Sequence, residues 1–235
     1  MVNGRHRLTG AVELMDLPNA DPAELARTLS DLAWINRRLG GLRLIRKHLA
    51  SFLADSPVPI RILDVGTGYA DIPRAIAHWG REAKRPVEIE AIDQHAQIVR
   101  LARQASAAYP EIRIRQGTAL TLPYPESSFD IVLASLVLHH MEGEAQIRLL
   151  RELYRVASRI VIVNDLRRGN WPLLVTWAAL QIVSGSRLIH HDGVLSVRRG
   201  FLARELAGLA GNAGWQSACV SQHAFFRLAL VGRKG

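Results

Sequence analysis

The sequence predicts an α/β fold: a mostly parallel sheet of seven strands with an antiparallel last strand, flanked by helices. Three observations support this prediction. Apolar, β-branched segments of strand length alternate with longer segments whose apolar residues recur at helical spacing. The first apolar segment runs directly into a glycine-rich turn, Gly66-Thr67-Gly68. Acidic or polar residues follow several of the predicted strands, where the ligand crevice of such a sheet lies.

Composition places the chain among folded proteins and excludes several classes. Its 235 residues are enough for one α/β domain with an ample core, and 49% of them are apolar. The net charge of +9 comes from arginines that are scattered along the chain, which favours solvated faces over a nucleic-acid footprint. Cys219 is the only cysteine, so an intrachain disulfide is excluded.

The sequence shows no targeting or membrane-spanning segment. No apolar signal-peptide region is visible near the N-terminus. The longest apolar segment, residues 171–183, is shorter than the ~20 residues that a membrane-spanning helix needs. We therefore expect a cytoplasmic protein, although its positive charge leaves open a peripheral contact with a membrane surface.

Residues 1–56 are expected to form an N-terminal helical cap. The first 20 residues show little pattern and predict a loose arm, of which residues 13–16 could fold over a later part of the chain. Asp21 is a suitable N-cap for a helix whose apolar residues, from position 25 to position 39, share one face. Two glycines end that helix, and a second helix is predicted over residues 42–53.

Residues 60–79 predict a strand, a glycine turn and a helix in that order. The apolar, β-branched residues 60–65 are typical of a buried parallel strand, and helical spacing starts at position 70. Gly66 can adopt a positive φ, and neither Gly66 nor Gly68 has a Cβ that would block a ligand lying on the backbone. The segment therefore provides the local structure that a nucleotide-type ligand needs.

Two acidic residues restrict the type of ligand that the glycine turn is expected to bind. The dinucleotide fingerprint requires glycine at the position of Asp71, so a pyrophosphate is disfavoured. Asp64 lies inside the strand end, just before the glycines, where a carboxylate favours a cationic or amine-bearing ligand.

The second predicted strand, residues 87–92, ends at Asp93. Asp93 follows the glycine turn by about 20 residues, the spacing expected of an acidic residue that accepts hydrogen bonds from ribose hydroxyls. It is also a good N-cap for the helix expected over residues 94–108, which begins at Gln94. Both roles are compatible.

Polar residues also follow the third and fourth predicted strands, residues 112–116 and 131–134. The third leads into Gly117-Thr118-Ala119, and the fourth into Ser135 and the pair His139-His140. Since the carboxyl end of a central strand borders the ligand crevice, we expect at least one of the histidines to have a site role. The alternative is that one caps a helix and the other packs.

The last third of the chain predicts the rest of the sheet and a long connection. A helix over residues 144–157 precedes a fifth strand over 158–164, at whose end Asp165 is either a turn residue or a site residue. The apolar residues 171–183 predict a helix that is either a lid over a substrate pocket or part of the core. A final helix over 197–209 and a hairpin of strands over 215–220 and 225–231 complete the prediction.

Two stretches carry a resemblance to a known family. ILDVGTGYAD, residues 62–71, resembles motif I of the class I S-adenosylmethionine (SAM) dependent methyltransferases. LPYPESSFDIVLASLVLHH, residues 122–140, is similar to a later motif of the ubiquinone-biosynthesis-type and polyketide-tailoring members. The resemblance covers about residues 60–165. It implies a Rossmann-like methyltransferase domain over residues 57–235, a substrate-binding or lid insertion at about 167–196, and SAM as the cofactor.

Carried over residue by residue, the resemblance implies a cofactor site. Asp64 flanks the glycine turn and Asp93 binds the ribose. The family pattern has aspartate where this chain has Thr118, so the adenine contact is a weaker hydroxyl contact or falls to the backbone of Ala119. The predicted cofactor-binding residues are Asp64, Gly66, Thr67, Gly68, Asp93, Gln94, Thr118, Ala119 and Ser135.

The catalytic residues are predicted from the needs of the reaction. The methyl group of SAM is already activated, so the protein mainly has to align the two reactants. A poor nucleophile such as a phenol also needs a general base, for which histidine is suited near pH 7. The candidates are His140, His139 and then His191, with Asp165 to orient an imidazole or bind the substrate. No metal site is predicted, because no H-x-x-x-H or H-E-x-x-H pattern occurs.

The function predicted from these features is methyl transfer, with O-methylation favoured, to a small lipophilic or aromatic acceptor by a monomer or homodimer. An RNA or DNA methyltransferase is an alternative because the isoelectric point is near 10.7. However, the proline motif of the N-methylating kinds is missing after the fourth strand. A SAM-binding partner subunit without catalysis is a further alternative. A nicotinamide-dependent reductase is disfavoured by Asp64 and by the missing third glycine.

Overall fold

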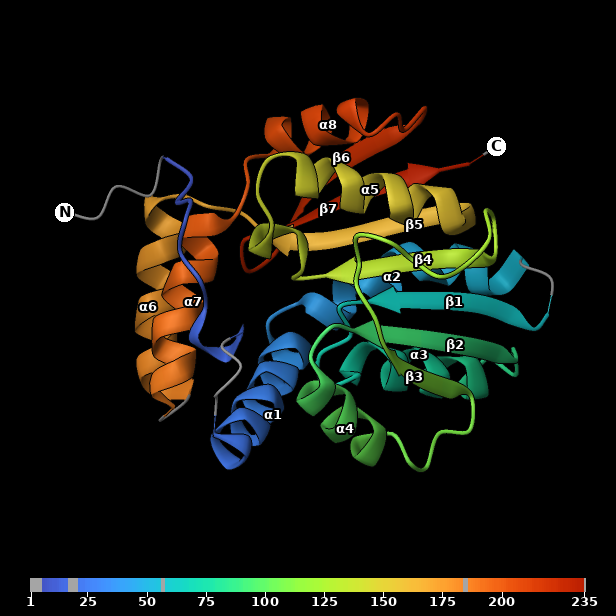
Figure 1. The fold of residues 1–235 in the computed structure, drawn as a ribbon, viewed down its shortest axis with the longest axis horizontal. Coiled ribbons are helices and arrows are strands. Elements are labelled where there is room, and N and C mark those ends of the chain that lie inside the picture. The colour runs from blue at the N-terminus through green and yellow to red at the C-terminus, as the bar shows by residue number, and fades with distance from the viewer. Residues whose placement is uncertain (1–5, 17–20, 56–57, 184–185, 235) are drawn as a thin grey trace.

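The computed structural model describes residues 6–16, 21–55, 58–183 and 186–234. Its core is one seven-stranded sheet with the order β3-β2-β1-β4-β5-β7-β6 (Figure 1). All neighbours pair in parallel except β7, which runs antiparallel to β5 and β6. The predicted fold class is therefore confirmed. The strands are β1 (Ile60–Val65), β2 (Val87–Asp93), β3 (Ile112–Gln116), β4 (Phe129–Ser135), β5 (Ala157–Leu166), β6 (Ala218–His223) and β7 (Arg227–Arg233).

Helices cover both faces of the sheet, which is why the central strands are apolar along their whole length. In β1, Ile60 and Ile62 pack toward helices α2 (Gly41–Asp55) and α3 (Asp71–Glu82). Leu63 and Val65 pack toward helices on the opposite face, α5 (Glu144–Val156) and α8 (Ala203–Asn212). Helix α4 (Ala96–Ala105) packs on β2 and β3 at the sheet edge.

The parallel pairing brings the carboxyl ends of β1, β2, β4 and β5 to one edge of the sheet. Asp64 pairs with Ala91 of β2 and with Leu133 of β4, and Ser135 pairs with Asn164 of β5. Helix α1 (Pro22–Arg38) and the antiparallel pair α6 (Asn170–Val183) and α7 (Arg187–Arg199) lie beyond this edge (Figure 1). These elements enclose the space above the strand ends.

The N-terminal segment, residues 6–16, crosses α7 instead of forming a loose arm. The backbone N–H of Leu8 donates to the carbonyl of Arg198 at 3.0 Å. The 3₁₀ turn η1 (Leu14–Asp16) is held by Asp192 of α7, whose carboxylate accepts from the N–H groups of Leu14 and Met15. Of the two possibilities, folding over a later segment is therefore the one the structure shows.

The predicted final helix over residues 197–209 is wrong, because the chain forms two helices with a break at Gly200. Residues 187–199 belong to α7 and residues 203–212 to α8. A Cβ at Gly200 would lie 2.6 Å from the carbonyl oxygen of Leu166, so only glycine allows the chain to pass so close to β5. Ser196, the predicted cap, lies inside α7.

The ends of several strands also differ from the prediction. β5 continues to Leu166, so Asp165 is a strand residue and not a turn residue. The closing hairpin starts later than predicted, at positions 218 and 227. Trp215 lies outside the sheet, where its Nε1–H donates to the carbonyl of Leu150 in the core. Large apolar residues near a strand end satisfy the strand pattern even when they pack elsewhere, which explains this error.

Candidate functional site

A cavity of about 420 Å³ lies at the carboxyl edge of the sheet. Its floor is made by the ends of β1, β2, β4 and β5 and by the turn between β6 and β7. Its walls are made by α1, by the inner faces of α6 and α7, and by the N-terminal segment. Ligand sites of open α/β sheets lie at this edge, as predicted.

The glycine turn after β1 is shaped by close backbone contacts. The N–H groups of Gly66 and Thr67 both donate to the carbonyl of Ile92, at 2.8 and 3.0 Å. Gly66 has φ +71°, and a Cβ there would lie 2.3 Å from Cγ2 of Val137. Gly68 has φ +53°, and no atom lies within 4 Å of the place where its Cβ would be. Both glycines line the cavity, so Gly66 serves the turn and Gly68 leaves room for a ligand.

Asp64 is a buried carboxylate without a hydrogen-bond partner. It is 1% exposed, lines the cavity, and neither carboxylate oxygen accepts a hydrogen bond. Burial, together with the charges of Asp71 and Asp93, raises the pKa of Asp64 to about 7. A carboxylate in this state is suited to a cationic ligand group, which would restore its charge and supply hydrogen bonds.

Arg227 provides the complementary charge and was not predicted from the sequence. It is 3% exposed at the start of β7, lines the cavity, and its Nη1 has no hydrogen-bond partner. Burial lowers the pKa of Arg227 to about 10, against the opposing influence of Asp165 and Asp71. Asp71 also lines the cavity and accepts a hydrogen bond from Asn36 of α1 at 3.2 Å. The cavity wall therefore offers both charge signs to a ligand.

Two predicted cofactor residues lie at the end of β2: Asp93, the last residue of the strand, and Gln94, which follows it. Asp93 lines the cavity and its two carboxylate oxygens accept from the backbone N–H groups of Gly68 and His95, each at 3.0 Å. These bonds join the glycine turn to the end of β2 and hold the carboxylate at the cavity wall. Gln94 also lines the cavity.

Two more predicted cofactor residues, Thr118 and Ala119, follow β3 and are placed differently relative to the cavity. Ala119 lines it together with Gly117. Thr118 is not among the lining residues, and its hydroxyl accepts from the backbone N–H of Leu120 at 3.2 Å. Of the two predicted routes to an adenine contact, the backbone at Ala119 is therefore the better placed.

The end of β4 carries a strained backbone. Ser135 lines the cavity, and its Oγ accepts from Nδ2 of the buried Asn164 at 2.7 Å. Leu136 follows with φ +59°, a left-handed conformation that costs a branched side chain about 1–2 kcal/mol. Its N–H donates to the carbonyl of Asn164 at 2.8 Å. This turn directs the chain into the 3₁₀ turn η2 (Leu138–His140), which carries both histidines.

His139 lies between two buried carboxylates. Its Nδ1 is 2.8 Å from Oδ1 of Asp165, and its Nε2 is 3.4 Å from Oε1 of Glu13. Burial alone would lower the pKa of His139, but the charges and hydrogen bonds of Asp165 and Glu13 raise it to about 9. The pKa values of the carboxyl groups of Glu13 and Asp165 are lowered in turn by His139, against the effect of burial. At neutral pH this imidazole is protonated, so it is unsuited to accept a proton from a substrate.

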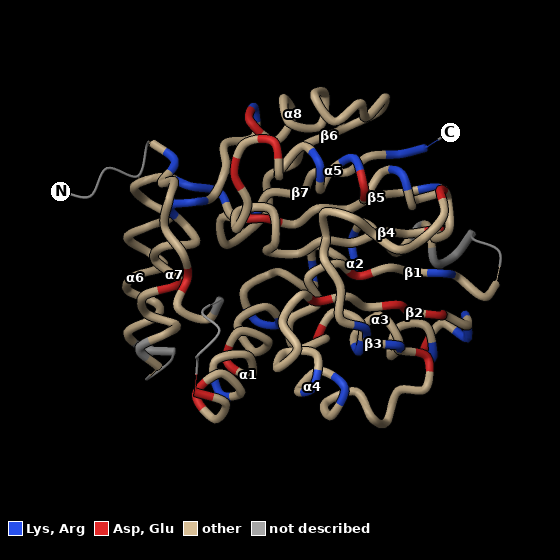
Figure 2. The backbone as a smooth tube through the Cα atoms, viewed as in Figure 1, with Lys and Arg blue, Asp and Glu red and all other residues tan. Residues whose placement is uncertain are grey.

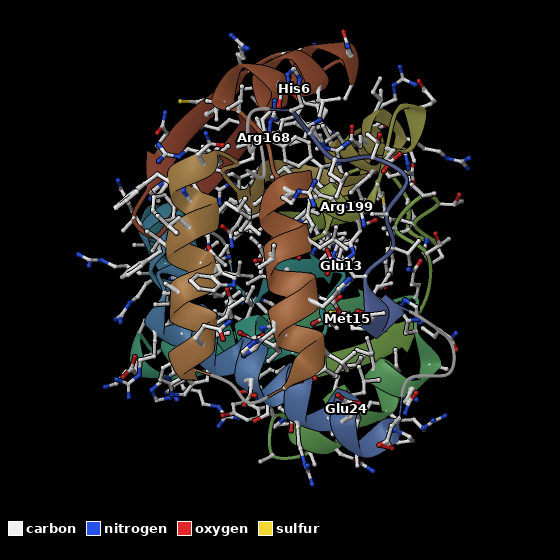
Figure 3. The ribbon with its side chains drawn as sticks, turned by 90° about the vertical axis from the view of Figure 1, so that its left-hand side faces the viewer. His6, Glu13, Met15, Glu24, Arg168 and Arg199 are labelled. Carbon is white, nitrogen blue, oxygen red and sulfur yellow. The ribbon has the colours of Figure 1, made fainter. Side chains whose placement is uncertain are left out.

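His140 is placed differently from its neighbour. Its side chain is 25% exposed and lines the cavity, with Nε2 3.8 Å from Oε2 of Glu13. Glu13 comes from the N-terminal segment, beside α7 (Figure 3), and its Oε1 also accepts from the hydroxyl of Ser196 at 2.8 Å. Sequence reasoning missed Glu13, although the acidic residue beside an apolar pair in Glu13-Leu14-Met15 was an available signal.

His191 lies away from the cavity. Its side chain lies on α7, is 53% exposed, and is not among the lining residues. Its Nδ1 is 2.9 Å from Oδ1 of Asp192. Asp192 itself lines the cavity and holds η1. The structure thus brings His139, His140 and Asp165 together and leaves His191 outside.

Glu13, His139 and His140 could also hold a metal ion. One ligand atom from each of the three lies within 4.8 Å of the others. The ion pairs of His139 with both carboxylates account for the same arrangement without an ion, and the prediction that the chain uses no metal stays a prediction.

The middle of the chain matches a known family model. Residues 63–159 match a family described as "Methyltransferase domain". The match begins inside β1 and ends inside β5, so it includes the glycine turn, the ends of β2 and β4, and both histidines of η2.

Curated relatives match about half of the chain. A demethylmenaquinone methyltransferase from Deinococcus radiodurans is 38% identical over 51% of this chain and 48% of that protein. A second demethylmenaquinone methyltransferase, from Thermus thermophilus, is 31% identical over 55% of this chain and 59% of that protein. The matches span about half the length of these relatives.

Solved structures share the fold along most of the chain. A SAM-dependent methyltransferase from Aquifex aeolicus aligns with a TM-score of 0.64 at 15% identity, over 91% of this chain and 98% of that one. A magnesium protoporphyrin IX methyltransferase from Synechocystis PCC 6803, solved with bound S-adenosylhomocysteine, aligns with a TM-score of 0.63 at 16% identity, over 94% and 98%. At these identities the likeness concerns the fold.

Proposed function

We propose that the chain is a class I SAM-dependent methyltransferase that transfers the methyl group of SAM to a small, apolar or aromatic acceptor. The observation that carries this proposal is the set of unpartnered charged atoms beside the glycine turn. Among the described residues, neither carboxylate oxygen of Asp64 has a hydrogen-bond partner. The Nη1 of Arg227 has none either. The methionyl end of SAM carries one ammonium and one carboxylate group, which matches these two charges.

The remaining cofactor contacts follow from the geometry of the cavity. Asp93 is held at the wall by two backbone N–H groups and has further lone pairs for the ribose hydroxyls. Ala119 and Gly117 line the region after β3 and would hold the adenine. The part of the cavity that His140 and the inner faces of α6 and α7 line would then receive the acceptor.

The acceptor is proposed to be apolar because the walls of that part are apolar. Leu29 and Leu32 of α1 line it, as do Leu180 and Val197 of the α6–α7 pair. The two curated relatives described above are named for demethylmenaquinone. We favour O-methylation of a phenolic ring, with His140 as the proton acceptor and Glu13 as the group that orients it.

Incubation with SAM and a panel of acceptors tests the reaction. We expect product masses 14 Da above phenolic, lipophilic acceptors, since one hydrogen is replaced by a methyl group. Small hydrophilic catechols and tRNA serve as the comparison. Methylation of the RNA, or no product from any apolar acceptor while SAM still binds, would contradict the proposal and favour one of the alternative functions.

Asp64 predicts a pH-dependent affinity for SAM. Because its pKa is raised to about 7 in the free protein, Asp64 is largely protonated at pH 6 and must ionise before it pairs with the ammonium group. We therefore expect the affinity for SAM to fall by about tenfold between pH 8 and pH 6. Below its pKa, the ionised fraction of Asp64 falls about tenfold for each pH unit, which costs about 1.36 kcal/mol of binding free energy. Isothermal titration at the two values measures it.

Two variants make this test specific. Asp64→Asn should bind SAM more weakly at pH 8 and should lose the pH dependence. Glu88→Gln, an exposed position on β2, is the matched control and should titrate like the wild type. Equal pH profiles for wild type and Asp64→Asn would show that the carboxylate does not pair with the cofactor.

A further inference from the structure

Helix α6 is apolar on its inner and its outer side. Leu173 and Leu180 are buried, and Val175 lines the cavity. On the opposite side, Trp171 is 65% exposed and Trp177 is 54% exposed. A helix that is apolar on all sides is normally buried, so we expect the exposed side of α6 to contact a binding partner.

The exposed residues form one stripe, which we call the α6 face: Trp171, Leu174 and Trp177. They are spaced three residues apart, so they lie on neighbouring positions of one side of the helix. Leu174 is 53% exposed. The other exposed residues of α6 that the structure describes are uncharged: Asn170, Ala178 and Gln181. Figure 2 shows the helix without a charged residue.

The charges around the α6 face have one sign. The segment from position 167 to 199 contains one acidic residue, Asp192, which is 4% exposed and is engaged by the backbone of η1. The same segment contains five arginines. Of these, Arg167 and Arg198 are partly exposed, whereas Arg168 and Arg199 are buried and Arg168 pairs with Glu205. An uncharged apolar stripe with tryptophans, beside basic residues and without an exposed acid, matches the requirements of an anionic bilayer surface.

We propose that the α6 face docks on the surface of an anionic lipid bilayer, with both tryptophans at the level of the headgroups. Tryptophan is suited to this depth because its ring is apolar and its N–H is polar. The 14 residues of α6 extend for about 21 Å, so the helix lies along the surface. No helix among the described residues is long and apolar enough to cross a membrane.

A second copy of the chain fits the α6 face less well. Stable protein interfaces bury about 800 Å² on each partner. Two tryptophans and one leucine, each a little more than half exposed, offer roughly half of that area, since a fully buried aromatic contributes about 150–250 Å². The bilayer needs no complementary partner surface, so an isolated stripe is sufficient.

Docking through α6 would also bring the cavity close to the membrane surface. The inner side of α6 lines the cavity through Val175, Thr176 and Ala179. A helix that lies on the bilayer would therefore separate the lipid phase from the cavity by the thickness of one helix, about 10–12 Å. This position suits an acceptor that is dissolved in the membrane, although docking itself does not depend on the proposed reaction.

Vesicle co-sedimentation tests the proposal with the full chain and without SAM. We expect the protein to sediment with vesicles of phosphatidylglycerol and phosphatidylcholine, with a blue shift of the tryptophan fluorescence. The triple variant Trp171→Ser, Leu174→Ser, Trp177→Ser should lose at least about tenfold in partitioning, since each side chain loses its apolar burial. Trp34→Ser, at a 47% exposed tryptophan of α1, is the matched control and should partition like the wild type.

Three outcomes overturn the proposal. One is equal partitioning of the triple variant and the wild type, with both lost at high salt, because binding would then rest on the arginines alone. Another is the absence of binding to any vesicle. The third is a dimer of the wild type by light scattering that the triple variant disperses, because the α6 face would then be a contact between copies. Thermal unfolding of each variant confirms that these exposed substitutions leave the fold intact.

Discussion

His140→Ala is expected to lower kcat by about 10²–10⁴-fold, the usual contribution of a general base. Among the predicted histidines, His140 combines a position in the cavity wall with access to solvent. Glu13, at 3.8 Å, can orient its ring and stabilise the imidazolium that forms when it accepts the acceptor's proton. Because the residues proposed to hold the methionyl and ribose groups lie elsewhere, the Kd for SAM should change by no more than about twofold.

The same assay with two further variants separates the role of His140 from a structural one. His191→Ala, at an exposed histidine outside the cavity, is the matched control and should keep wild-type kcat. Glu13→Gln should lower kcat and shift its pH profile, because an amide no longer stabilises the imidazolium. If His140→Ala leaves kcat unchanged with a phenolic acceptor, the acceptor does not need a base at this position, and proton transfer must be assigned elsewhere.

Asp165→Ala is expected to destabilise the fold by about 3–5 kcal/mol, because it leaves His139 charged and buried with only Glu13 as partner. Asp165 is 0% exposed and accepts from both the Nδ1–H and the backbone N–H of His139, at 2.8 and 3.1 Å. For a chain of this length the loss corresponds to a fall in Tm of about 6–20 °C. Urea unfolding at pH 7 measures the free energy directly.

The pH dependence of the same variant identifies the ion pair as the cause. The pKa of His139 is raised to about 9 in the folded protein, above its ordinary value of 6.5, so its pairing is fully present below pH 6.5 and is lost as the pH rises through 9. The wild type should therefore lose stability between pH 7 and pH 9.5, and Asp165→Ala should lose much less over that range.

A surface carboxylate provides the comparison. Glu144 is 72% exposed and pairs with Arg151 at 3.2 Å, a kind of contact that contributes about 0–1 kcal/mol. Glu144→Ala should therefore unfold close to the wild type at every pH. A similarly small effect of Asp165→Ala would contradict the view that His139 is charged and paired.

The local parts of the site were predictable from the sequence. The strand before the glycine turn, the turn itself and Asp93 after β2 are encoded within segments of a few residues, where spacing and residue type are informative. Asp64, Gly66, Gly68 and Asp93 all line the cavity. Thr118 is not among the lining residues, since a motif places a residue along the chain but does not show which way its hydroxyl turns.

Contacts between distant segments were not predictable in this way. Glu13 meets His139 across 126 positions of the chain, and Arg227 reaches the cavity from the last strand. No local sequence pattern indicates that Glu13 contacts His139 or that Arg227 lines the cavity. The helix break at Gly200 was missed for a related reason, since its cause is the carbonyl of Leu166 on a neighbouring strand.

By itself, the sequence determined the order of the strands, the glycine turn and the acidic residues beside it, because each depends on backbone preferences and periodic burial over a short stretch of chain. Only the tertiary structure decided which histidine is buried between two carboxylates and which one is also accessible to solvent. The reason is physical: the charge of an imidazole depends on its burial and on the groups within a few ångströms, and here those groups come from segments far apart in the chain.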